Sequence, residues 1–105
     1  MAVIAAGEAS NGRTLAVRIG DCIELELPDN PTTGYRWRVV AAGEPVCEKT
    51  AEHLVADGSG PGAPGLLHCE FRVLTRGTAR IQLDFKRSWS SSVERSFTLD
   101  ISAHA

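Results

Sequence analysis

The side chains of this chain that could act as nucleophiles, general bases or metal ligands are few and lie far apart. Its three histidines, His53, His68 and His104, are separated by long stretches, and neither a GxSxG nor an HExxH motif occurs. Those motifs support hydrolysis because they hold a serine beside oxyanion donors, or two imidazoles on one face of a helix. The sequence therefore predicts a protein that is not an enzyme, with no catalytic and no metal-binding residues. His68 falls on the polar phase of a predicted strand and is expected to be a surface residue.

The three cysteines, Cys22, Cys47 and Cys69, contain no CxxC pair, so neither a zinc ribbon nor a thioredoxin-like redox site is indicated. An odd number of thiols cannot be fully paired within one chain. Cys69 is in phase with the apolar residues of its strand, so we expect it to be buried. Cys22 lies on the polar phase and is the better candidate for an accessible thiol. Free thiols fit a reducing compartment better than an oxidising one.

The segment Gly60–Gly65 matches the letters of the dinucleotide-binding motif GxGxxG. That motif binds a pyrophosphate when a strand precedes it and a helix follows it, because N–H groups at the helix N-terminus hold the phosphates. Here the residues after Gly65 alternate as a strand, and Pro61 and Pro64 remove N–H donors from the loop. We therefore expect no nucleotide at this loop.

Length and composition fit a single domain over residues 1–105, with a core from about residue 15 to residue 101. The chain has 105 residues, of which 43% are hydrophobic, and a net charge of −2. A nucleic-acid binder would show a basic patch, and no apolar run approaches the ~20 residues of a membrane span. We expect a monomer that binds neither nucleic acid nor membranes. The N-terminus is no convincing signal peptide, which predicts a cytoplasmic location, or a periplasmic or secreted one if a signal has been removed.

Apolar residues at every second position predict a series of short strands. In Cys22–Leu27, for example, Ile23, Leu25 and Leu27 alternate with polar residues, which is the period of a half-buried strand. The pattern recurs with turn residues about every 8–12 positions. It predicts the strands Leu15–Ile19, Cys22–Leu27, Tyr35–Ala41, Val46–Lys49, Leu67–Val73, Ala79–Phe85 and Phe97–Ile101. About seven strands without an amphipathic helix are typical of an all-β, immunoglobulin-like β-sandwich.

Two segments outside these strands are expected to be irregular. Ala5–Thr14 is small, polar and contains glycine, which predicts a loose N-terminal segment, and Thr50–Ala56 could form a helical turn. Within the strands, the apolar phase predicts the core residues Leu25, Trp37, Phe71, Leu83, Phe85 and Leu99.

The connection between the strands at Cys22–Leu27 and Tyr35–Ala41 is longer and stiffer than a hairpin requires. A two-residue turn needs only Asn-Gly or Asp-Gly. Here Pro28 and Pro31 fix φ and restrict the residues before them. The side chain of Asn30 can bond to the loop backbone, and Gly34 can adopt a positive φ. Stiffness of this kind lowers the cost of ordering a loop when it binds a partner.

Three unusual loops are expected to lie at one end of the sandwich. They are Asn30–Gly34, the glycine- and proline-rich segment Gly58–Gly65, and the polar segment Arg87–Glu94. In an immunoglobulin-like sandwich these three connections occupy the same end, so they would form one continuous rim. Trp89 lies outside the apolar phase of both strands next to it. It is either a lid over the end of the core or an exposed aromatic residue, a type that is enriched in binding hot spots.

The three loops resemble, in order, the three signatures of the chagasin-type inhibitors of papain-like cysteine peptidases. The NPTTGY-like first signature is intact as Asn30, Pro31, Thr32, Thr33, Gly34 and Tyr35. The GxGG-like second signature is matched by Gly62, Ala63, Pro64 and Gly65, with Pro64 in place of a glycine. The RPW-like third signature is matched by Arg87, Ser88 and Trp89, with Ser88 in place of the proline. Spacing and strand pattern agree with the family from about Leu15 to Ile101.

The resemblance implies an immunoglobulin-like sandwich that inhibits papain-like cysteine peptidases reversibly and competitively, without a cofactor. It implies that the three loops enter the active-site cleft together. Thr32 and Thr33 would lie across the catalytic cysteine and histidine, Gly62–Gly65 would lie along a substrate subsite, and Trp89 with Arg87 would pack on the far side. The alternative is a non-catalytic β-sandwich module that binds another protein or a glycan, and a small enzyme ranks third.

Overall fold

The computed structural model describes residues 2–29, 34–56 and 65–105. Within these ranges the chain forms eight strands and one short 3-10 helix, Glu8–Ser10. The strands are β1 (Val3–Ala6), β2 (Arg13–Arg18), β3 (Cys22–Asp29), β4 (Tyr35–Ala42), β5 (Cys47–Ala56), β6 (Gly65–Val73), β7 (Gly77–Arg87) and β8 (Arg95–His104). No helix in the described part of the chain is long and apolar enough to cross a membrane.

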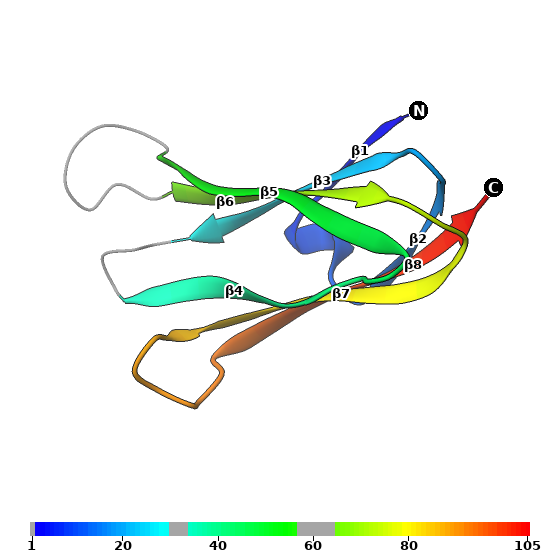
Figure 1. Ribbon diagram of the computed structural model, residues 1–105. Helices are drawn as coiled ribbons and strands as arrows, with labels where there is room; N and C mark the ends of the chain where they lie inside the picture. Colours follow the sequence, from blue (N-terminus) through cyan, green and yellow to red (C-terminus); the bar gives the residue numbers. More distant parts are fainter. Residues whose placement is uncertain (1, 30–33, 57–64) are drawn as a thin grey trace.

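The strands form two four-stranded sheets that enclose a common core (Figure 1). The strand order is β1-β3-β6-β5 in the first sheet and β2-β8-β7-β4 in the second. Neighbouring strands are antiparallel except for β1 with β3 and β2 with β8, which are parallel. This is the all-β, immunoglobulin-like sandwich that the sequence predicts, with eight strands in place of about seven.

The core is built from alternate residues of the strands, as the apolar phase predicts. Its fully buried side chains are Phe71, Phe97, Ile23, Leu25, Leu27, Ile81, Leu83, Leu99, Ile101, Val73, Cys47 and Cys69. Each large apolar side chain contributes about 1.5–3 kcal/mol by leaving water. The predicted core residues Leu25, Trp37, Phe71, Leu83 and Leu99 are buried, and the prediction that Cys69 is buried is also confirmed.

Phe85 is the one predicted core residue that is only half-buried. It lies near the end of β7, where its ring stacks on Tyr35 at 5.4 Å and packs against Trp37 at 5.0 Å between centroids. The core therefore ends in an aromatic cluster rather than in aliphatic side chains.

The N-terminal segment that was predicted to be loose is ordered, so that prediction is wrong. Ala5–Thr14 contains the end of β1, the 3-10 helix and the start of β2. Strand β1 pairs in parallel with β3, from Val3 opposite Cys22 to Ala6 opposite Leu25. Ile19, assigned to the apolar phase, is 45% exposed because β2 ends at Arg18 and the chain then turns towards β3.

The helical turn predicted at Thr50–Ala56 is also wrong. These residues continue β5, which pairs with β6 from Cys47 opposite Val73 to Ala56 opposite Gly65. The predicted short strand at Val46–Lys49 is thus the beginning of a ten-residue strand. A register shift between Lys49 and Ala51 interrupts the alternation of side chains.

Asp21 holds the turn between β2 and β3. Its carboxylate accepts hydrogen bonds from the backbone N–H of Arg18 at 2.9 Å and of Ala2 at 3.0 Å. These two bonds lower the pKa of Asp21, because they stabilise its charged form. The bond from Arg18 has the larger effect. The turn is therefore tied to the N-terminal strand by an ionised side chain.

Candidate functional site

The strand ends that carry the three predicted loops lie together at one end of the sandwich (Figure 1). In the first sheet, Asp29 at the end of β3 is opposite Gly65, and Gly65 is also opposite Ala56 at the end of β5. In the second sheet, Tyr35 at the start of β4 is opposite Arg87 at the end of β7. The predicted site residues Asn30–Thr33 and Gly62–Pro64 lie outside the described residues, whereas Gly34, Tyr35, Gly65, Arg87, Ser88 and Trp89 lie within them.

The two stems of the first loop belong to different sheets and are clamped to each other. The Nε of Arg36 on β4 donates to the Asp29 carboxylate on β3 at 3.1 Å, and the side chain of Asp29 is fully buried. The indole Nε1–H of Trp37 donates to the backbone carbonyl of Pro28 at 2.8 Å. The clamp fixes the distance between the ends of the loop. The sequence analysis missed it, although opposite charges at Asp29 and Arg36 flank the loop.

Trp89 stands at the tip of the β7–β8 loop and is 72% exposed. The N–H of Ser90 donates to the carbonyl of Arg87, which closes a four-residue turn with Ser88 and Trp89 at its centre. The N–H of Glu94 donates to the carbonyl of Phe85 and closes the base of the loop. Of the two interpretations of Trp89, the exposed aromatic residue is therefore the one observed.

One edge of the Trp89 ring packs on Gly34 of the first loop. A Cβ built on Gly34 would lie 2.7 Å from Cη2 of the indole, so a side chain at this position would displace the ring. The φ of Gly34 is +80°, in the left-handed region that other residues rarely adopt. Glycine is required here both for the turn and for the approach of the indole, so the first and third loops touch.

Arg87 forms a second link between these two loops. Its guanidinium carbon lies 4.5 Å from the centroid of the Tyr35 ring and 5.8 Å from that of the Trp89 ring, which are cation–π distances. The residues Tyr35, Arg87, Trp89, Ser90, Ser91, Ser92 and Glu94 line an open hollow of about 400 Å³. The rim thus presents an aromatic ring, a fixed positive charge and a small hollow side by side.

Arg95 is a further residue at this end that the sequence analysis missed. It lies at the start of β8, with its guanidinium carbon 5.3 Å from the Trp37 ring and 5.4 Å from the Phe85 ring. The position follows from the register that places Arg95 opposite Phe85, which no sequence pattern reveals. Arg95 thus covers the rings of Trp37 and Phe85, which form the end of the core below the loops.

The thiols are placed for packing rather than for reaction. Cys47 and Cys69 are buried, and burial raises the pKa of both, that of Cys69 to about 11. Cys22, the predicted accessible thiol, is half-buried. Desolvation, with the nearby carboxylates of Glu70 and Glu24, raises its pKa. A raised pKa leaves little of the thiolate that acts as a nucleophile.

Comparison with known proteins agrees with this geometry. The family model for "Chagasin family peptidase inhibitor I42" matches residues 16–101. The chain is 32% identical to chagasin from Trypanosoma cruzi over 88 residues, which are 79% of this chain and 80% of that protein. It is 34% identical to amoebiasin-1 from Entamoeba histolytica over 101 residues, which are 90% of this chain and 93% of that protein.

The likeness extends to the three-dimensional structure. The crystal structure of the cysteine protease inhibitor EhICP2 from Entamoeba histolytica matches this fold with a TM-score of 0.88 at 25% identity. The match covers 99% of this chain and 97% of that one. The family model spans β3 to β7 together with all three loop segments. This chain therefore belongs to the chagasin family of peptidase inhibitors.

Proposed function

We propose that this protein is a reversible, competitive inhibitor of papain-like cysteine peptidases. It acts through the β3–β4, β5–β6 and β7–β8 loops, which enter the active-site cleft of the target as one unit. It binds the peptidase without catalysing a reaction. The membership of the chagasin family and the likeness to a cysteine protease inhibitor support the target class.

The observation that carries the proposal is the packing of Trp89 on Gly34. An exposed tryptophan on a free loop would lose conformational entropy when a partner orders it, at about 0.5–1.5 kcal/mol per immobilised side chain. Here the glycine surface under the indole and the guanidinium of Arg87 beside it already restrict the ring. A large aromatic residue that is exposed and preorganised has the properties of a binding hot spot.

The clamp at the first loop supports the same function. A peptidase can cut a loop that adapts to its active site, whereas a stiff loop resists the extended conformation that cleavage requires. The Asp29–Arg36 ion pair and the Pro28–Trp37 hydrogen bond fix both stems of this loop. In the proposal, Thr32 and Thr33 lie across the catalytic centre, Gly62–Gly65 follows a substrate subsite, and Trp89 with Arg87 packs on the far wall.

The test is a titration of papain with the purified protein, followed with a small fluorogenic peptide substrate. Activity should fall in proportion to the inhibitor added, recover on dilution, and fall less at higher substrate concentration. Mass spectrometry should find the inhibitor intact after prolonged incubation, and trypsin, a serine peptidase, should keep its activity. Full papain activity in a large excess of folded protein would refute the proposal.

A further inference from the structure

The outer face of the first sheet brings imidazole and carboxylate side chains from three strands together. On this face Glu24 of β3 is opposite Glu70 of β6. Two residues further along β3, Glu26 is opposite His68. His53 of β5 lies on the other side of His68, and the two rings are 4.9 Å apart. Directly opposite side chains in adjacent strands are close enough to interact. This face lies away from the core and contains none of the loop residues.

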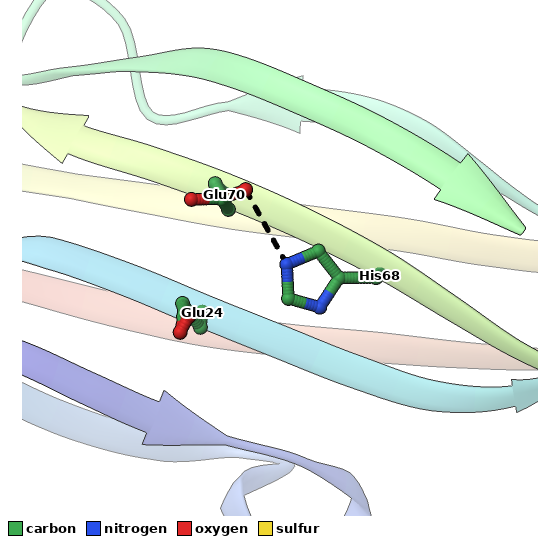
Figure 2. Close-up of side chains that lie close together, drawn as sticks. All are labelled: Glu24, His68 and Glu70. Carbon is green, nitrogen blue, oxygen red and sulfur yellow. Dashed lines mark ion pairs between the residues drawn. The ribbon is translucent and has the colours of Figure 1, made fainter. Parts of the chain in front are cut away.

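We infer that Glu24, His68 and Glu70 form a binding site for one divalent transition-metal ion. One potential ligand atom from each of these residues lies within 4.8 Å of the other two. Figure 2 shows the imidazole of His68 joined to the Glu70 carboxylate, with Glu24 on the neighbouring strand. The Nε2 of His68 lies 3.4 Å from Oε2 of Glu70. Around a tetrahedral zinc ion with bonds of about 2.0–2.1 Å, neighbouring ligand atoms lie about 3.3–3.5 Å apart. The His68–Glu70 edge has this spacing, and the Glu24 carboxylate, which lies within 4.8 Å of both, must move closer to join it.

The orientation of His68 is that of a metal ligand. Its Nδ1 lies 3.2 Å from Oε2 of Glu26, a carboxylate oxygen that can accept a hydrogen bond from Nδ1–H. In metal sites a carboxylate at this position fixes the tautomer and leaves the Nε2 lone pair for the ion. In that tautomer the Nε2 lone pair and the Glu70 carboxylate face each other at 3.4 Å. A zinc ion bonded to both atoms would fit this spacing.

The carboxylates of this face also favour a bound cation. Glu24 and Glu70 are direct cross-strand partners, an arrangement that destabilises a sheet when both are ionised. Glu26 adds a third carboxylate one rung away, and Arg72, opposite Cys22, places one positive charge on the other side of the pair. A divalent ion between Glu24 and Glu70 removes this repulsion. The His68 side chain is 15% exposed and that of Glu70 35%, so water can complete the coordination shell.

The ligand set selects the class of metal ion. One imidazole and two carboxylates suit zinc and the neighbouring first-row divalent ions, whereas magnesium and calcium prefer oxygen ligands only. A proton bound to Nε2 of His68 is the rival occupant, because it would also bridge to Glu70. The two occupants differ in one respect that can be measured, since only the metal site binds zinc at a fixed stoichiometry.

The test uses untagged, metal-free protein and zinc in competition with a chromophoric chelator. One zinc ion should bind per chain. Glu26→Gln should weaken binding about 10–100-fold, because it removes the partner that orients His68. His68→Gln should weaken binding more than Glu26→Gln, and Glu24→Gln and Glu70→Gln should each weaken it measurably. Cobalt should give the visible absorption bands of a bound ion, and these should be absent in His68→Gln.

His104→Gln is the matched control, since His104 lies on β8 in the other sheet. It should leave zinc affinity unchanged, and millimolar magnesium should not displace the zinc. Equal zinc affinity in His68→Gln and the parent, or displacement by magnesium, would overturn the inference. Circular dichroism of each metal-free variant checks folding. If His68→Gln does not fold, the imidazole nitrogen chemical shifts of the parent decide, because zinc must shift the Nε2 resonance of His68.

Discussion

Trp89 and Gly34 form a contact in which the glycine surface serves as the seat of the indole. Position 34 has a φ of +80°, and a Cβ there would lie 2.7 Å from Cη2 of the ring. The backbone of one loop and the side chain of another are thus matched to each other before any partner arrives.

Gly34→Ala should reduce both stability and inhibition. Alanine at a left-handed φ costs about 1–2 kcal/mol, and its methyl group would push the indole from its place. Urea unfolding measures the first effect, and the inhibition constant for papain measures the second.

Gly12→Ala is the matched control for that substitution. Gly12 has a φ of +77°, but no atom lies within 4 Å of a Cβ at this position. It should lose a similar amount of stability and keep full inhibition. If both variants inhibit papain equally, the seat under Trp89 has no part in binding.

Trp89→Ala should weaken papain inhibition by about 2 kcal/mol or more, the cost expected of a hot-spot residue. The melting temperature should change little because the side chain is 72% exposed. Leu74→Ala, which removes a 43% exposed side chain after the other end of β6, should leave inhibition unchanged. A large fall in melting temperature with unaltered inhibition would show that Trp89 is structural.

Ser88→Pro should make the third loop stiffer. Ser88 is the second residue of the turn closed by Ser90 and Arg87, a position that favours proline, and Arg87 before it is extended. The substitution should stabilise the fold by about 0.4–1 kcal/mol and slow dissociation from papain. Ser90→Pro should do the opposite, because it deletes the N–H that closes the turn. Stopped-flow and urea measurements on both variants check the signs.

Arg36→Ala, which breaks an ion pair to a buried carboxylate, should destabilise the fold more than Arg80→Ala, which breaks an exposed ion pair. Arg36 pairs with the fully buried carboxylate of Asp29, and its removal should cost about 1–3 kcal/mol. Arg80 pairs with Asp100, and both side chains are well exposed, so solvent screens the pair and its removal should cost less than that of Arg36. Equal losses in urea unfolding would mean that the clamp contributes no more than a surface ion pair.

Asp21 should make the fold sensitive to acid. Hydrogen bonds from Arg18 and Ala2 lower its pKa below the ordinary value of 3.8. The stability that it contributes is therefore complete above about pH 5, where the carboxyl is ionised in both states, and is lost as the pH falls through the lowered folded pKa. Asp21→Asn should be less stable than the parent at pH 6 and should lose less further stability between pH 5 and pH 2. Urea unfolding measures stability at each pH. An equal loss of stability between pH 5 and pH 2 in the parent and in Asp21→Asn would contradict this prediction.

Strands with an unbroken alternation were predictable from the sequence, and the remainder were not. The alternation of β3 and β6 reports which face is buried, and from it the sandwich follows. In β5 the register shift after Lys49 breaks the two-residue alternation of side chains. The sequence pattern therefore predicts a short strand followed by a helical turn. In β1 the parallel backbone pairing with β3 depends on a distant segment rather than on side-chain pattern.

The candidate site was predictable as a set of segments but not as a surface. The letters of the three loops predict which segments form the site, and among the described residues Gly34 of the first loop and Trp89 of the third are in contact. Whether Trp89 is exposed depends on the turn at Arg87 and on the backbone of Gly34, and neither follows a periodic pattern. The stacking of Arg87 on Tyr35 results from the pairing of β4 with β7.

The central place of β8 in its sheet has a consequence for the order of events on the ribosome. Strand β8 pairs with β7 on one side and with β2 on the other, and β2 is made long before it. During vectorial synthesis β2 emerges without its partner and keeps an unpaired backbone edge until β8 arrives. The second sheet can therefore be completed only after β8 has been translated. Translation that stops before Arg95 should yield a nascent chain that is open to chaperones and proteases.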